Sequence, residues 1–70
     1  MADTIRDTAE LGRLVRAERK RQGLRQEDLA LAAGTGRRFI VDLENGKSSV
    51  RLEQVLAVIN GLGLTVRIGP

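Results

Sequence analysis

The stretch GLRQEDLALAAGTGRRFIVDLENGK, residues 23–47, decides the fold. It predicts two short helices, over residues 26–33 and 37–45, on either side of a turn at Gly34. Glycine suits this turn because it readily adopts the positive φ of a left-handed position. Two helices this short need other elements to pack against, so we expect the flanking segments to complete the fold.

The second helix of this pair is expected to have two unlike faces. At 100° per residue, its apolar side chains converge on one face, formed by Phe39, Ile40 and Leu43. The other face is polar and begins with two arginines; it carries Arg37, Arg38, Val41, Asp42 and Asn45. We expect the apolar face to lie in the core and the arginine face to meet solvent or a ligand.

Helices are also expected on both sides of this pair. Asp7 and Glu10 have the spacing of a capping box, which predicts a helix over residues 8–22. Glu18 falls on the apolar face of that helix and needs a partner that the sequence does not identify. The last helix is expected from about residue 52 to residue 62. Its apolar stripe comprises Leu52, Val55, Leu56, Ile59 and Leu62, with Val58 at the edge.

The tail Leu64–Ile68 alternates apolar and polar residues, which predicts a half-buried strand. A single strand has no partner in an otherwise helical chain, so we expect it to pair with the same strand of a second subunit. The predicted dimerisation residues are Leu64, Val66 and Ile68. The expected organisation is a flexible N-terminus (1–7), a helical domain (8–62) and a dimerisation strand (63–70).

The composition argues against an enzyme and against a membrane protein. The 70 residues include no His and no Cys, which removes the commonest general base, thiol nucleophiles and thiolate metal sites. We therefore expect no catalysis, no cofactor and no bound metal. Apolar runs stay far below the roughly 18 residues of a membrane span, and no signal pattern is visible. A cytoplasmic, nucleoid-associated protein is expected.

The charge balance favours nucleic acid or an acidic membrane as partner. Twelve Lys and Arg oppose nine Asp and Glu, a formal net charge of +3, and ten of the twelve cations are arginine. Arginine suits bidentate contacts with phosphate and guanine. One Phe, with no Trp or Tyr, argues against RNA and single-strand modules that stack bases on aromatic rings.

Residues from about Leu11 to Leu62 resemble the Cro/repressor-type (XRE) helix-turn-helix domain. The similarity rests on Gly-Leu-x-Gln-x-x-Leu-Ala from Gly23 and on Leu-Glu-Asn-Gly-Lys at the end of the second helix of the pair. The tail Gly-Leu-Gly-Leu-Thr-Val-Arg-Ile is similar to that of HipB-like antitoxins. The resemblance implies an all-α, lambda-repressor-like bundle of four to five helices. It also implies a homodimer that binds an inverted-repeat operator, represses its own operon and binds a HipA-type kinase toxin.

The resemblance also implies which residues contact DNA. They are Arg25, Gln26, Gly36, Arg37, Arg38, Val41, Asp42, Lys47 and Ser48. Arg37 and Arg38 are candidates for binding guanine or phosphate, and Gln26 for the DNA backbone or a base edge. Asp42 either accepts a hydrogen bond from cytosine or pairs with Arg38 four residues earlier, and we favour the pair.

Two further implications concern structure and alternatives. Arg19 and Glu44 match a partly buried ion pair that links the first helix to the end of the third. A phage-type or restriction-control repressor is the alternative within the DNA-binding class. A dimeric interaction module that does not bind DNA is the alternative outside it, since a fold does not determine a function.

Overall fold

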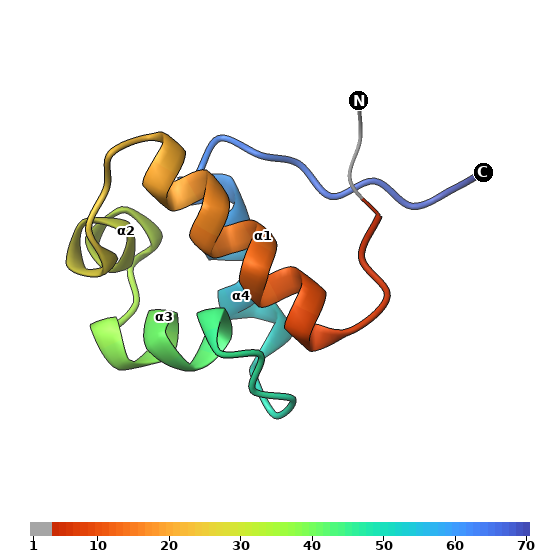
Figure 1. The fold of residues 1–70 in the computed structure, drawn as a ribbon, viewed down its shortest axis with the longest axis horizontal. Helices are drawn as coiled ribbons and strands as arrows, with labels where there is room; N and C mark the ends of the chain where they lie inside the picture. The colour runs from red at the N-terminus through yellow and green to blue at the C-terminus, as the bar shows by residue number, and fades with distance from the viewer. Residues whose placement is uncertain (1–3) are drawn as a thin grey trace.

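Four α-helices joined by short loops make up the described part of the chain (Figure 1). A computed structural model describes residues 4–70, so residues 1–3 of the predicted flexible N-terminus lie outside it. The helices are α1 (Thr8–Arg21), α2 (Gln26–Ala33), α3 (Arg37–Glu44) and α4 (Leu52–Gly61). The all-α prediction is confirmed. Three predicted helices extended one residue too far, because Gln22, Asn45 and Leu62 are the C-cap residues.

The helix pair α2 and α3 joins the other two helices into one bundle. α2 packs against both α3 and α4, and α1 packs across α3 (Figure 1). All four helices contribute to one aliphatic core, which consists of Val15, Leu29, Ala30, Ile40, Leu43, Val55, Val58, Ile59 and Leu62. The core therefore sits directly behind α3 and supports its inner face.

The turn between α2 and α3 has the geometry that its glycine predicts. Gly34 ends α2 with φ +70°, and the Thr35 amide donates to the carbonyl of Ala30 at 2.9 Å. This bond satisfies a carbonyl that the helix end leaves without a partner. Gly36 follows in an extended conformation as the N-cap of α3. Only Thr35 and Gly36 separate the C-cap of α2 from the first residue of α3.

The start of α1 is capped almost as predicted. Asp7 accepts a hydrogen bond from the Glu10 amide at 2.8 Å. The Glu10 carboxylate, however, accepts from the amide of Arg6 at 2.8 Å instead of the Asp7 amide. Both bonds satisfy amides near the helix start that have no intrahelical partner.

α1 approaches the end of α3 unusually closely, at a glycine that the sequence analysis did not single out. A Cβ atom on the buried Gly12 would lie 2.5 Å from the Leu43 carbonyl oxygen and 2.7 Å from that of Glu44. Nearby, the Thr8 hydroxyl donates to the carbonyl of Gly46 at 2.8 Å. The two helices can therefore pack at this distance only because Gly12 has no side chain.

The predicted apolar stripe of α4 was partly wrong. Leu52 and Leu56 are exposed, whereas Val58, placed at the edge, is completely buried. The buried arc is centred between Val58 and Ile59, which puts Leu56 about 110° away at 100° per residue. Leu52 lies in the first turn of α4. Burial thus follows the side of α4 that faces α2, and not the full width of the apolar stripe.

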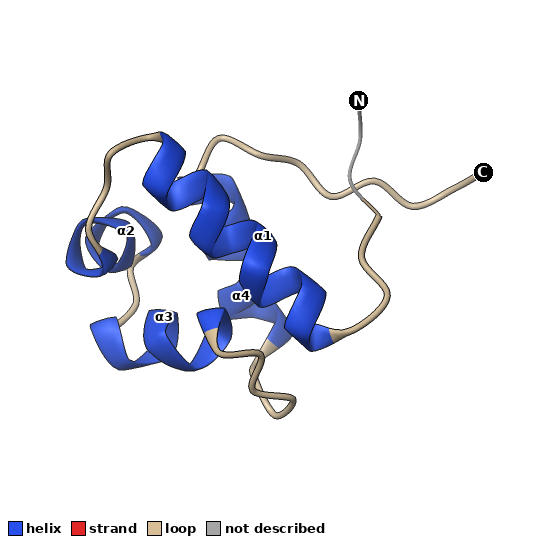
Figure 2. Ribbon diagram, in the orientation of Figure 1, coloured by secondary structure: helices blue, strands red, loops and turns tan. Residues whose placement is uncertain are grey.

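The predicted C-terminal strand is absent from residues 4–70 of the single chain. Residues 64–70 run as an extended tail that forms no strand (Figure 2). Leu64 packs against the core, Val66 is about half exposed and Ile68 is 99% exposed. A strand is defined by backbone hydrogen bonds to a neighbour, and one chain supplies none here. Pairing of this tail between two subunits stays a prediction.

Glu18 finds its partners at the end of its own helix. Its carboxylate accepts from Arg21 at 2.6 Å and 2.9 Å and from the Gln22 side chain at 2.8 Å. These hydrogen bonds, led by that from Arg21, lower the pKa of Glu18 from 4.5 to about 2. Gln22 also donates to the Leu62 carbonyl at 2.7 Å, so this group connects α1 with the end of α4.

Candidate nucleic-acid interface

α3 presents to solvent the polar face that its periodicity predicts. Ile40 and Leu43 are buried on the inner side, while Arg37 and Arg38 are exposed on the outer side. We call the set Gly36, Arg37, Arg38, Val41 and Asp42 the outward face. The inner side of α3 packs on the aliphatic core, so its arginines project from a helix that the core supports.

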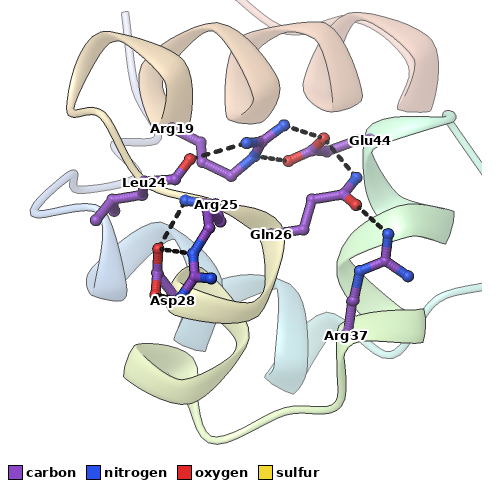
Figure 3. Close-up of polar contacts among 7 residues, drawn as sticks. All are labelled: Arg19, Leu24, Arg25, Gln26, Asp28, Arg37 and Glu44. Atoms are coloured by element: carbon purple, nitrogen blue, oxygen red, sulfur yellow. Dashed lines mark hydrogen bonds and ion pairs between the residues drawn. The ribbon is translucent and has the colours of Figure 1, made fainter.

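A buried ion pair holds the end of α3 to α1. Arg19 Nε donates to Glu44 Oε2 at 2.6 Å and Arg19 Nη2 donates to Oε1 at 3.0 Å (Figure 3). The two side chains are only 9% and 3% exposed. Arg19 Nη1 also donates to the Leu24 carbonyl at 2.9 Å. The hydrogen bonds with Glu44 raise the pKa of Arg19 above its usual value, in spite of desolvation.

Gln26 links this ion pair to the first residue of α3. Its Nε2 donates to Glu44 Oε1 at 3.2 Å, and its Oε1 accepts from Arg37 Nη2 at 3.0 Å (Figure 3). The sequence predicts separate DNA contacts for Gln26 and Arg37, and it does not predict this contact between them. No periodic pattern predicts it, because the two residues belong to different helices and meet only across the turn. These two hydrogen bonds fix the orientation of the Gln26 side-chain amide.

Arg25 is the last cation before α2 and is paired locally. Its Nη2 and Nε donate to the Asp28 carboxylate at 3.0 Å and 3.1 Å, and its backbone amide donates to Asp28 at 2.9 Å. The Arg25 side chain is the largest cause of the lowered pKa of Asp28. The Arg25 side chain is largely exposed, so its ion pair with Asp28 is weak. A contact between Arg25 and an anion can therefore replace this pair.

Asp42 lies between two cations. Its Oδ1 is 3.3 Å from Arg38 Nε, which is the pair favoured from the spacing, and its Oδ2 is 3.6 Å from Lys47 Nζ. The contact with Lys47 was not anticipated. Lys47 lies beyond the end of α3, and the turn at Gly46 brings it back along the helix. Ser48 follows, exposed, in the same loop.

A surface hollow of about 450 Å³ lies beside the start of α2. Its lining adds Arg16 and Asn45 to residues already described; the full set is Arg16, Arg19, Leu24, Arg25, Gln26, Glu44 and Asn45. The sequence does not mark Arg16, on α1, as a DNA-contact residue. Its place in this lining puts Arg16 on the same side of the molecule as Arg25 and Gln26.

Two structural findings concern metals and membranes. Residues 4–70 contain no group of three or more His, Cys, Asp or Glu side chains arranged to hold a metal ion. Within the same residues, no helix is both long enough and apolar enough to cross a membrane.

Comparisons with known proteins agree with this architecture. The family described as "Helix-turn-helix" matches residues 15–68. A Sinorhizobium fredii protein named "Uncharacterized HTH-type transcriptional regulator y4mF" is 50% identical over 68 residues, which span 97% of this chain and 90% of that protein. The "ImmF control region 10 kDa protein" of Bacillus phage phi105 is 35% identical over 57 residues, 77% of this chain and 63% of that protein. With this match over most of its length, and with the tight turn between α2 and α3, the chain belongs to the helix-turn-helix family.

Proposed function

We propose that this chain is a sequence-specific, double-stranded DNA-binding transcriptional regulator that acts as a repressor. The observation that carries the proposal is the outward face of α3, where Arg37 and Arg38 project from a helix braced by the core and by the Arg19–Glu44 pair. The names of the two relatives, a transcriptional regulator and a phage control-region protein, support the same class.

The size and charge of this face suit the major groove of DNA. An α-helix fits the major groove, where arginine can donate two hydrogen bonds to guanine O6 and N7. In the proposed complex Arg37 and Arg38 fill this role, and Val41 meets a thymine methyl group. Lys47 and Ser48 contact phosphate beyond the end of α3. Arg25, Gln26 and Gly36 contact the DNA near the starts of α2 and α3.

The proposal is tested by a mobility-shift assay with the duplex upstream of the chain's own coding sequence and a scrambled duplex of equal length. We expect a shift with the upstream duplex at lower protein concentration than with the scrambled one. Binding should weaken as salt rises, with a log–log slope of about −0.9 for each neutralised phosphate. Absence of any shift at low salt would favour an interaction module that does not bind DNA.

In the same assay, Arg38→Ala is expected to weaken binding to the upstream duplex by about 1–3 kcal/mol and to relax specificity at one base position. The reason is the loss of a bidentate base contact. Arg13→Ala removes the same charge from α1, beside the N-terminal segment, and is the matched control. Equal weakening on every duplex would instead identify Arg38 as a phosphate contact.

We further propose that the active form is a homodimer paired through Leu64–Ile68. Ile68 is 99% exposed and Val66 about half exposed, which leaves apolar surface on a small chain that would benefit from a partner. A two-fold dimer would bind an inverted repeat with half-sites about 34–36 Å apart or a multiple of that distance.

The dimer is tested by sedimentation of Val66→Asp/Ile68→Asp. We expect the double variant to sediment as a monomer, because it places like charges where the apolar side chains of two tails would meet. Thr65→Asp/Arg67→Asp alters the alternate positions of the same tail and should stay dimeric. Deletion of residues 64–70 is less informative, since Leu64 also packs on the core. A double variant that remains dimeric would exclude tail pairing.

Within this class we propose an autoregulating antitoxin of a HipA-type kinase toxin, located in the cytoplasm on the nucleoid. The tail pattern supports this assignment. The 35% identity to a phage control-region protein favours a second candidate, a phage-type repressor. Neighbouring genes separate the candidates: a kinase-like toxin gene supports the first, phage genes the second, and a methyltransferase gene a restriction-control protein.

A further inference from the structure

Most cations proposed to contact DNA are already held by carboxylates of the protein itself. Arg25 pairs with Asp28, whereas Arg38 and Lys47 share Asp42. Asp42 differs from Asp28 because it stands on the outward face of α3 and holds two cations at once. An acid at this place repels phosphate, so its presence on such a face calls for an explanation.

The two cations contact different oxygens of the Asp42 carboxylate. One carboxylate oxygen lies 3.3 Å from Arg38 Nε and the other lies 3.6 Å from Lys47 Nζ. The Asp42 side chain is 20% exposed, while those of Arg38 and Lys47 are 86% and 53% exposed. Pairs this exposed contribute little to stability. The two ion pairs therefore affect the direction of the exposed Arg38 and Lys47 side chains more than the stability of the fold.

The pairing uses Arg38 Nε and leaves both terminal nitrogens available. Those nitrogens are the donors that a guanine edge accepts in the major groove. Arg38 can therefore contact a matching base while it stays paired with Asp42. A phosphate contact by Arg38 is different, because Arg38 must turn away from the carboxylate to neutralise the DNA backbone. The pair is then lost, and Asp42 is left facing like charge.

We propose that Asp42 is a specificity-determining residue that disfavours binding to non-matching DNA. This inference rests on the proposed DNA-binding function. Its carboxylate competes with phosphate for Arg38 on non-matching DNA, but is compatible with the base contact of Arg38 on the matching sequence. Its competition for Lys47 is common to both complexes. Specificity is a difference between two affinities, so weakening the non-matching complex raises it.

The test compares wild type with Asp42→Asn on one pool of randomised-sequence duplexes, by selection and sequencing, and on one scrambled duplex across a salt series. At roughly 0.1 M salt, one additional phosphate contact is worth about tenfold in affinity. We expect Asp42→Asn to bind the scrambled duplex about tenfold more tightly and with a salt slope steeper by about 0.9. Sequence enrichment from the pool should fall by a similar factor.

Two further variants decide whether position and charge both matter. Asp42→Glu keeps the carboxylate and should retain most of the wild-type enrichment. Glu53→Gln removes an exposed negative charge from α4 and should change enrichment little. Thermal unfolding should show that all three variants are folded.

Three results would overturn the inference. The first is equal strengthening of matched and scrambled duplexes by Asp42→Asn, with enrichment preserved. The second is a Glu53→Gln effect as large as that of Asp42→Asn, which would indicate a response to net charge alone. The third is loss of enrichment in Asp42→Glu. If the wild-type protein binds no duplex at all, the proposed function fails, and this inference fails with it. That outcome is distinct from the other three.

Discussion

Glu44→Gln is expected to destabilise the protein by about 3–5 kcal/mol, because it leaves the Arg19 guanidinium buried without its counter-charge. The replacement has nearly the same shape, so the loss is electrostatic and not a cavity effect. The side chains are 9% and 3% exposed, and the carboxylate accepts three hydrogen bonds, including one from Gln26. In a small domain such a loss approaches the whole free energy of unfolding. Urea denaturation followed by circular dichroism measures it.

The matched control is Glu53→Gln, which makes the same chemical change at an exposed site on α4 and should alter stability by less than about 0.5 kcal/mol. A second variant tests the cause. Replacing both partners, Arg19→Met with Glu44→Leu, should recover much of the lost stability, since no charge then remains buried. If Glu44→Gln were as stable as Glu53→Gln, the ion pair would not brace the fold.

Gly12→Ala is expected to destabilise the protein by about 3 kcal/mol, at the upper end of the range for over-packed interiors. The added Cβ would lie 2.5 Å from the Leu43 carbonyl oxygen and 2.7 Å from that of Glu44. Both atoms belong to the backbone, so no side chain can rotate to make room. α1 must instead move away from α3, which also disturbs the Arg19–Glu44 pair.

Gly61→Ala is the control for this change, because its nearest neighbour would be 3.6 Å from the new Cβ, an ordinary contact. Gly61 is the last residue of α4, and alanine favours helices over glycine by up to about 1 kcal/mol. This control should therefore be neutral or slightly stabilising. Thermal unfolding of both variants provides the comparison, and equal midpoints would show that α1 can shift without cost.

Local patterns predicted the elements well because the forces that form them act over a few residues. The capping spacing at Asp7, the turn glycine Gly34 and the two faces of α3 all depend on neighbours along the chain. Such patterns locate a helix and its apolar side. They also indicated that Arg38 and Asp42, four residues apart on one helix, would meet.

Those local patterns did not predict the contacts between helices. The periodicity of α4 did not reveal that Leu56 would be exposed and Val58 buried, since this depends on where α2 lies. The link from Gln26 to Arg37 and the second cation on Asp42 each join residues from different elements. Likewise, the spacing of residues along α1 does not predict how close Gly12 lies to the end of α3.

The sequence by itself determined the four helices, the turn at Gly34 and the arginine-led side of α3, because capping, glycine conformation and apolar periodicity are local properties. Only the tertiary structure decided how those parts work together. It showed α1 seated on α3 through Gly12, and Arg19 joined through Glu44 and Gln26 to Arg37. The physical reason is that packing distances and shared hydrogen bonds arise only when surfaces distant in sequence are brought together.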